Sequence, residues 1–324
     1  MPKVLNIPKP EPAQRLLIAG LIVLAISVLF LTWQVKGNWD FVLPYRGKKL
    51  FTLIIVGCTV PVATLVFQTL THNRILTPGI MGFGALYVLI QSSLLFTLGI
   101  VGFSQLNTYI KWSIETGLMV VCVLLIYRSL FRGSSHSLYL VVLAGIIMGV
   151  LFTSANQLMM RWLDPTEFTV LQDAMYATFG TVKTPLLLIS WLVLGTCCLF
   201  LWRTHNHLDV FLLGREQCLS LGLDYSRYSK LWLLLSTLLI SLTTSLVGPM
   251  TFFGLLVVHL TYLFAGNYKH RFLIPMTALL GMFTLVSGEF LLQHVWQFNT
   301  RLSIIIELLG GLLFLFLITR KQRP

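Results

Sequence analysis

Residues 50–70, LFTLIIVGCTVPVATLVFQTL, form a run of 21 positions without a charged side chain. About 20 consecutive apolar residues are enough for an α-helix to cross the hydrocarbon core of a bilayer. Nine further largely apolar segments, one of them short, occur at 16–33, 79–98, 113–131, 138–160, 185–203, 228–248, 252–265, 272–294 and 304–319. The sequence therefore predicts an all-α polytopic membrane protein with about ten transmembrane helices, bounded to within a few residues.

The composition of the whole chain agrees with this prediction. Its 324 residues are 56% hydrophobic and 10% charged, with a mean hydropathy of +0.84, whereas a soluble domain carries about 25% charged residues. So few charges cannot cover a water-facing surface, and lipid must cover much of it. Ten spans use most of the length, so we expect a single transmembrane domain over residues 1–324.

The chain is strongly basic, with a formal net charge of +12. No basic run is long enough to follow a phosphate backbone, so we expect no nucleic-acid partner. If the N-terminal segment 1–15 is cytoplasmic, most Lys and Arg residues fall on the cytoplasmic side, which predicts that both termini are cytoplasmic. The predicted outer loop Lys36–Lys49 is an exception, because it carries four positive charges.

The sequence lacks the common motifs of nucleotide-binding proteins and hydrolytic enzymes. The chain contains no nucleotide-binding GxxxxGK[ST], no HExxH and no GxSxG. We therefore expect no catalytic residues, and the energy for any uphill transport must come from a partner chain or an ion gradient. The cysteines lack the spacing of metal ligands, so we expect no metal site and interpret them as packing residues: Cys58, Cys122, Cys197, Cys198 and Cys218.

Few acidic residues fall in the predicted spans. Glu115 is expected at the start of the fourth helix, and Glu289 and Glu307 near the ends of the last two. An ion-coupled secondary transporter places charges near the membrane midplane. This class is therefore the weaker alternative, and a membrane scaffold without transport is the third.

One polar stretch, residues 205–230, carries an apolar pattern. Residues 208–222 read LDVFLLGREQCLSLG, in which leucines alternate with polar residues over about two helical turns. This pattern predicts a pair of short amphipathic helices. Such an element either docks another protein or lies on the lipid surface, and the pattern alone favours neither.

The stretch 212–223, LLGREQCLSLGL, is similar to the segment LGxxxAxSLGV of the iron–siderophore and vitamin B12 permease family, the FecCD-type permeases of ABC importers. In that family the segment presents helices to an ATPase subunit. The resemblance therefore assigns residues 205–230 to a cytoplasmic coupling region. The ATPase-coupling positions are Leu213, Gly214, Ser220, Leu221 and Gly222, with Cys218 in place of the family's small Ala.

Other blocks resemble the same family in the same order along the chain. The sequence departs from the family pattern at Arg74, Val258 and Leu309, where the family has Pro. Residues 164–168, DPTEF, and 171–179, LQDAMYATF, resemble the branch that carries ferric catechol siderophores. The family-motif positions are Gln68, Asn73, Pro78 and Gly82 in the second-helix block, Gly254 and His259 in 246–260, His270 and Arg271 in 265–281, and Glu307 in the last helix.

The resemblance implies the type II ABC importer permease fold and a set of partners. These are a second permease subunit, the same chain or a related one, two ATPase subunits that bind ATP and Mg, and a substrate-binding protein. It further implies a ferric siderophore as substrate, the inner membrane as location, and a path lined by helices 138–160 and 304–319. Positive residues before the second and last helices of the family meet the binding protein, and the matching positions are Arg46, Lys49 and Arg301. The alternative for Lys48 and Lys49 is binding to lipid headgroups.

Overall fold

The structure, a computed structural model, describes residues 11–35, 37–130, 138–180, 182–295 and 300–321. Most of the expected cytoplasmic segment 1–15 lies outside these ranges. The elements are α1 (Pro12–Thr32), α2 (Trp39–Thr71), η1 (Pro78–Met81, a 3₁₀ turn), α3 (Phe83–Gln105), α4 (Thr108–Leu130), α5 (Leu138–Met160), α6 (Pro165–Ala174), α7 (Thr184–Phe211), α8 (Arg215–Ser220), α9 (Tyr225–Val247), α10 (Phe253–Phe264), α11 (His270–Phe290), η2 (Leu291–Val295, π-helical) and α12 (Leu302–Lys321).

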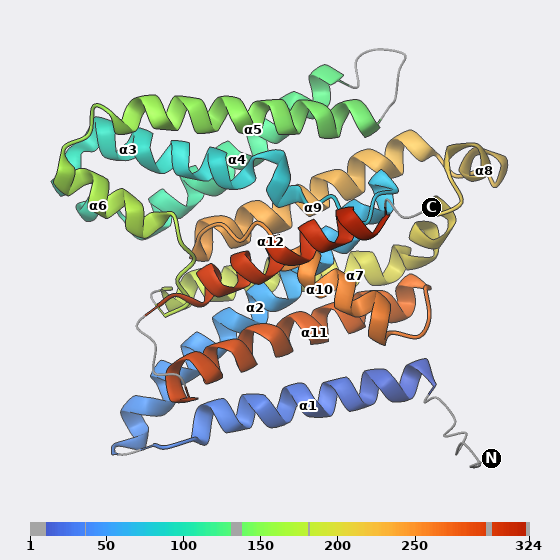
Figure 1. Ribbon diagram of the computed structural model, residues 1–324, viewed down its shortest axis with the longest axis horizontal. Coiled ribbons are helices and arrows are strands. Elements are labelled where there is room, and N and C mark those ends of the chain that lie inside the picture. Colours follow the sequence, from blue (N-terminus) through green and yellow to red (C-terminus); the bar gives the residue numbers. More distant parts are fainter. Residues whose placement is uncertain (1–10, 36, 131–137, 181, 296–299, 322–324) are drawn as a thin grey trace.

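The predicted all-α class is confirmed, and the predicted number of spans agrees with the helices observed. Eight helices of the described part of the chain are long and apolar enough to cross a membrane, and α10 and α12 are shorter apolar helices. The long helices lie side by side with roughly parallel axes (Figure 1). Two short helices, α6 and α8, occupy the polar stretches between the spans.

Helix α2 forms the centre of the bundle. In its most apolar stretch 89% of the residues are buried, against 17% in α1. It packs on α7, α9, α10 and α11. The α11 contact is backbone against backbone, because a Cβ added at Gly57 would lie 2.8 Å from the Cα of Met282. Small residues permit such close approach between membrane helices.

Two predicted helix starts are wrong, with the same physical cause. Helix α2 begins at Trp39, after Asn38 accepts a hydrogen bond from the backbone N–H of Asp40, so most of the predicted outer loop is helical. Helix α4 begins at Thr108, which places Glu115 two turns inside the helix rather than at its start. Hydropathy marks where a helix enters lipid, whereas a helix continues through polar residues as long as its backbone bonds are satisfied.

The polar stretch 205–230 is corrected in the same way. Helix α7 continues to Phe211, so residues 205–211 of this stretch extend a membrane helix. Only α8 forms a separate short helix, and α9 begins at Tyr225. The predicted helix pair is thus the end of α7 together with α8.

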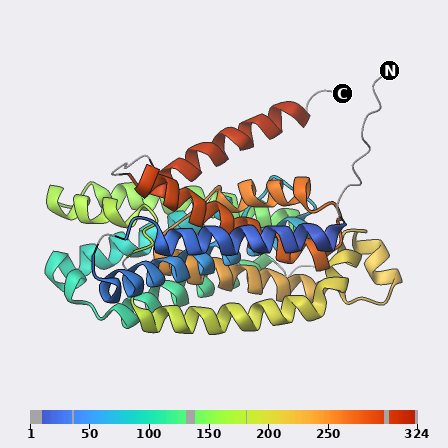
Figure 2. The ribbon, with the colours of Figure 1, turned by 90° about the horizontal axis from the view of Figure 1, so that it is seen from below.

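The two ends of the bundle differ in what they carry. The start of α1, the end of α12 and α8 lie at one end, which we call the α8 end (Figure 1). Helix α6 and the starts of α2 and α12 lie at the other, the α6 end. Toward the α8 end, α12 leans away from the bundle (Figure 2). Among its described residues, the exposed large apolar ones are Ile304, Leu308, Leu309, Leu312, Leu315 and Phe316.

Candidate functional site

Helix α8, at the predicted coupling positions, lies between two glycine turns. Gly214 (φ +97°) precedes it and Gly222 (φ +78°) follows it, conformations that residues with a Cβ rarely adopt. Cys218 is fully buried, and its thiol donates to the carbonyl oxygen of Val210 at 3.4 Å. Burial raises the pKa of the Cys218 thiol, which keeps it protonated. Cys218 therefore anchors α8 against the end of α7.

The outer side of this segment is apolar and exposed. Leu213, Leu219 and Leu221 are 57%, 55% and 62% exposed, and Leu212 is 45% exposed. The hydroxyl of Ser220 donates to the carbonyl of Glu216 within the helix at 3.0 Å. Exposed apolar side chains clustered on a short helix are typical of a surface that another protein covers.

Aromatic rings join the two helices that flank α8. Phe211 of α7 stacks on Tyr225 of α9 with ring centroids 4.6 Å apart, and meets Trp232 edge-on at 4.8 Å. Phe211 and Trp232 are fully buried. Aromatic pairs in these geometries stabilise beyond their burial alone, so the rings hold the end of α7 against α9.

A buried polar network ties α7, α11 and α2 together through the family-motif residue His270, which is 0% exposed. Its backbone N–H and its ring Nδ1 both donate to Asp209 Oδ1, at 2.8 and 2.6 Å. Its Nε2 lies 2.9 Å from the hydroxyl of Thr69 in α2. The carboxylate accepts from Nδ1–H and so fixes the orientation of the imidazole ring. The next motif residue, Arg271, stacks on Phe272 at 4.5 Å.

The turn after α2 shows how the chain accommodates one departure from the family. His72 ends α2 with φ +50°, and the side chain of Asn73 accepts from the backbone N–H of Ile75 at 3.0 Å. Arg74, where the family has Pro, lies over the ring of Tyr262 at 4.5 Å. The guanidinium therefore replaces the rigidity of Pro with a cation–π contact.

Gln68 precedes this turn and is buried in α2. Neither of its amide atoms has a hydrogen-bond partner among the described residues. His259 lies half-buried in α10. The structure thus distributes the family-motif residues over helix junctions rather than bringing them together at one site.

A cavity of about 730 Å³ opens between η1, the start of α3, α5 and α12. Its size lies within the range of about 300–1,000 Å³ typical of ligand sites. It is lined by α5 and by Glu307 of α12, the two helices that the resemblance assigns to the path. Most of its other lining is apolar or glycine; its polar lining residues are Thr153, Ser154, Asn156, Gln157, Thr251 and Glu307.

Glycines set the width of this cavity. Pro78 begins η1 and Gly82 (φ +85°) ends it. A Cβ added at Gly149 would lie 2.9 Å from the Cα of Gly82, and one at Gly145 would lie 3.0 Å from the Cβ of Met81. The GxxxG pair of α5 therefore packs on η1.

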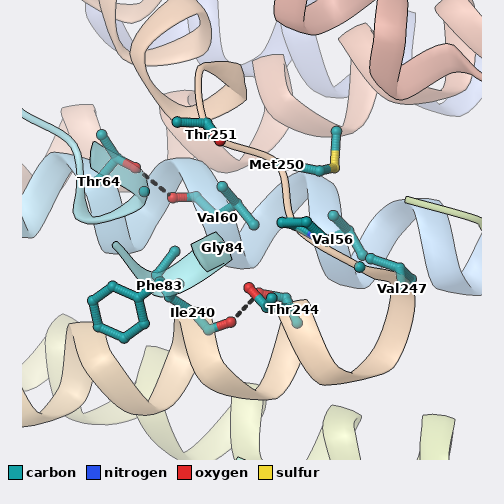
Figure 3. Close-up of a pocket in the computed structure, with 14 residues that line it drawn as sticks. Val56, Val60, Thr64, Phe83, Gly84, Ile240, Thr244, Val247, Met250 and Thr251 are labelled. Carbon is teal, nitrogen blue, oxygen red and sulfur yellow. Dashed lines mark hydrogen bonds between the residues drawn. The ribbon is translucent and has the colours of Figure 1, made fainter. Parts of the chain in front are cut away.

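Beside the cavity of about 730 Å³, a much smaller cavity of about 20 Å³ lies against α2. Val56, Val60 and Thr64 of α2 face Phe83 of α3 and the loop at Thr251 across it (Figure 3). This volume accommodates about one water molecule. Of these two cavities, the larger one has room for a bulky ligand.

The three predicted docking residues all have partners within the chain, and two of them, Arg46 and Lys49, bind neighbouring helices of the bundle. Arg46 donates to the carbonyls of Phe30 and Trp33 at the end of α1, at 3.2 and 2.7 Å. Lys49 pairs with Glu289 of α11 at 2.5 Å, and their side chains are 13% and 7% exposed. Both cations therefore hold α2 against neighbouring helices at the α6 end.

Arg301, at the start of α12, is more accessible. Its guanidinium donates to the carbonyl and the carboxylate of Asp173 in α6, both at 2.6 Å. The side chains of Arg301 and Asp173 are 31% and 80% exposed. Arg301 thus lies at the outer surface of the α6 end.

Sequence reasoning placed Glu115 at the start of a helix and did not predict its burial. Glu115 is 2% exposed and accepts a hydrogen bond from the amide of Gln91 in α3 at 2.7 Å. Both line a cavity of about 260 Å³ that Lys111 and Ser245 also border. The presence of a glutamate within an otherwise apolar span was the available signal.

Comparison with known proteins agrees with this architecture. The family model described as "FecCD transport family" matches residues 16–320 of this chain. The petrobactin import system permease protein YclO of Bacillus subtilis (strain 168) is 38% identical over 307 residues, which cover 95% of this chain and 97% of that protein. The petrobactin import system permease protein FatC of Bacillus anthracis is 32% identical and covers 86% and 78%.

Solved structures share the fold at low sequence identity. A metal-chelate type ABC transporter in an inward-facing conformation has a TM-score of 0.83 at 18% identity, over 95% of this chain and 99% of that one. PsaBC from Streptococcus pneumoniae, in complex with Fab, has a TM-score of 0.58 at 18% identity, over 91% and 94%. The fold is therefore that of the type II ABC importer permeases, and the chain belongs to the FecCD transport family.

Proposed function

We propose that this chain is the membrane-spanning permease subunit of an ABC importer and that it moves a ferric siderophore, of the catechol type, into the cell. The observation that carries this proposal is the similarity, over nearly the whole chain, to two permeases named for petrobactin import. The chain itself binds no cofactor and catalyses no reaction. ATP and Mg are bound by separate ATPase subunits.

A second permease subunit, a copy of this chain or a related one, covers α5 and α12. The exposed leucines of α12 need such a partner or lipid, and the cavity of about 730 Å³ lies beside both helices. The chelate passes between the two subunits along this cavity. Its glycines and few polar groups offer a bulky chelate a largely non-binding wall.

The two ATPase subunits bind at the α8 end. Leu213, Leu219 and Leu221 form the apolar contact, and the aromatic cluster behind α8 carries its movement to α7 and α9. The two conformations of the importer must differ in affinity for nucleotide and binding protein, since otherwise ATP binding and transport are not coupled.

A turn substitution tests this coupling. Gly222→Pro is incompatible with φ +78° because Pro fixes φ near −65°. We expect this variant to assemble with its ATPase and to transport more slowly. Gly222→Asn is the matched control, because Asn tolerates positive φ and a Cβ at this position meets nothing within 4 Å. Normal uptake by Gly222→Pro would contradict the coupling role.

The substrate-binding protein docks at the α6 end, where Arg46, Lys49 and Arg301 lie. Arg301 makes the direct contact, and the partly shielded Arg46 and Lys49 contribute to the positive field that orients the encounter. In this arrangement the α8 end and both termini face the cytoplasm, and the protein lies in the inner membrane. Charge reversal at Arg46 and Arg301 together should weaken docking, with a loss that shrinks in high salt. Unchanged affinity would refute this docking site.

The whole proposal is tested by ATPase activity of the reconstituted importer. The chain is placed in lipid with its candidate ATPase, with and without a binding protein loaded with a ferric siderophore. We expect the loaded binding protein to stimulate ATP hydrolysis. Failure to co-purify with any ATPase would favour an ion-coupled secondary transporter instead.

A further inference from the structure

An apolar groove of about 440 Å³ runs between α1 and α11 and lies beside the end of α10. Two helical stripes face each other across it, each with the three- and four-residue spacing of one helix face. The groove is lined by these two stripes and by Phe264. The stripes consist of Ile18, Ala19, Ile22 and Val23 of α1 and of Met276, Leu279, Leu280 and Phe283 of α11.

Arg15 lies at the mouth of this groove and is the only charged lining residue among the described part of the chain. Its Nη1 donates to the carbonyl of Phe264 at 3.1 Å, at the C-terminal end of α10. Gly266 (φ +66°) makes room for the guanidinium, because a Cβ there would collide with Arg15. The cation is therefore held in a fixed place by the neighbouring helix end.

The depth of the groove matches a lipid chain that enters from the interface. Arg15 lies in the first turn of α1, and the lining continues to Val23, which is about 12 Å further at 1.5 Å per residue. This length is close to the half-thickness of the hydrocarbon core, about 15 Å. Arg15 thus lies at the level of the headgroups and the apolar stripes at the level of the acyl chains.

We propose that this groove is a binding site for one anionic phospholipid, with an acyl chain between α1 and α11 and the phosphate on Arg15. A guanidinium suits phosphate because its planar N–H groups pair with two oxygens. No acidic residue lines the groove in the described chain.

The site also accounts for how α1 is held. In the most apolar stretch of α1 only 17% of the residues are buried, and its contact surface is largely α11. A lipid in the groove extends that contact without further side chains. Occupancy should therefore stabilise the attachment of α1 to the bundle.

Native mass spectrometry of the purified protein tests the proposal. The probes are phosphatidylglycerol and phosphatidylcholine with identical acyl chains. A basic residue near a membrane surface contributes about 1 kcal/mol toward anionic lipid, so we expect about fivefold greater retention of phosphatidylglycerol. Arg15→Ala should abolish that preference, whereas Arg203→Ala, an exposed arginine that does not line the groove, should leave it unchanged.

A second variant separates the groove from the charge. Ala19→Phe fills the groove and leaves Arg15 in place, so retention of both lipids should fall by a similar factor. Equal retention of the two lipids by the unmodified protein would overturn the proposal. So would an unchanged preference in a monodisperse Arg15→Ala sample.

Discussion

Replacing Lys49 by Met should destabilise the protein more than any other single charge removal at the α6 end. The ammonium lies 2.5 Å from the Glu289 carboxylate, whose side chain is 7% exposed and also accepts from Gln293 at 2.8 Å. Removing one partner of a buried ion pair typically costs about 3–5 kcal/mol, because the other charge stays buried without a counterion. Since Lys49 keeps 13% exposure, we expect a loss near the lower limit, about 3 kcal/mol.

Replacing the partner carboxylate, Glu289, should lower the free energy of unfolding by less. Glu289→Gln keeps the shape and the acceptor for Gln293, and the long side chain of Lys49 can extend its ammonium toward the headgroup region. We therefore expect about 1 kcal/mol for Glu289→Gln alone. The double variant should recover most of the loss of Lys49→Met, because no unpaired charge remains buried.

Reversible unfolding in mixed detergent micelles, followed by circular dichroism, measures these free energies. Lys48→Met is the matched control: Lys48 is exposed on the same turn, and its loss should stay within about 0.5 kcal/mol. The reasoning fails if Lys49→Met equals Lys48→Met, or if Glu289→Gln does not rescue it. Affinity for the binding protein, measured on the same variants, separates docking from stability, since Glu289→Gln cannot restore a lost docking contact.

Three further substitutions or modifications test other contacts. Gly281→Ala should cost about 1–3 kcal/mol of unfolding free energy, because its Cβ would lie 2.9 Å from the Gly57 carbonyl carbon. The control Gly195→Ala, whose Cβ meets nothing within 4 Å, should be neutral or stabilising. Equal effects of the two substitutions would refute the packing argument. His270→Ala leaves the Asp209 carboxylate without its ring donor and should lower the melting temperature, whereas an unchanged melting temperature would show the network to be dispensable. Cys218 should resist a maleimide at pH 8 until detergent unfolds the chain, because burial raises its thiol pKa and lowers its thiolate fraction; rapid labelling of the folded protein, read by peptide mass spectrometry, would refute this.

The spans were predictable because an apolar run of membrane length is a local property of the sequence. Residues 50–70 fall entirely within α2, and the short segment at 252–265 corresponds to α10. Helix ends were not predictable from hydropathy. The start of α2 depends on the Asn38 cap, and the end of α7 on burial of Phe211, and neither feature changes the apolar pattern.

The turns around α8 were predictable for a different reason. Gly214 and Gly222 occupy positions with positive φ, so residue type alone indicates both turns. The exposure of the neighbouring leucines is not indicated by residue type. Burial of Cys218 agrees with its interpretation as a packing residue. Its contact with the carbonyl of Val210 in the preceding helix could not be foreseen.

The four positive charges of Lys36–Lys49 could not be interpreted from the sequence pattern alone. As a predicted outer loop, this stretch violated the usual charge bias of membrane proteins, and the family resemblance assigned Arg46 and Lys49 to docking. In the structure Arg46 satisfies carbonyl groups that the end of α1 leaves without intrahelical partners, and Lys49 neutralises Glu289. Both partners lie on helices that the sequence pattern could not place beside α2. Arg301 also has a partner within the chain, Asp173, but its side chain is 31% exposed against 13% for Lys49. Of the positions that the resemblance assigned to docking, Arg301 is therefore more accessible to another protein than Lys49.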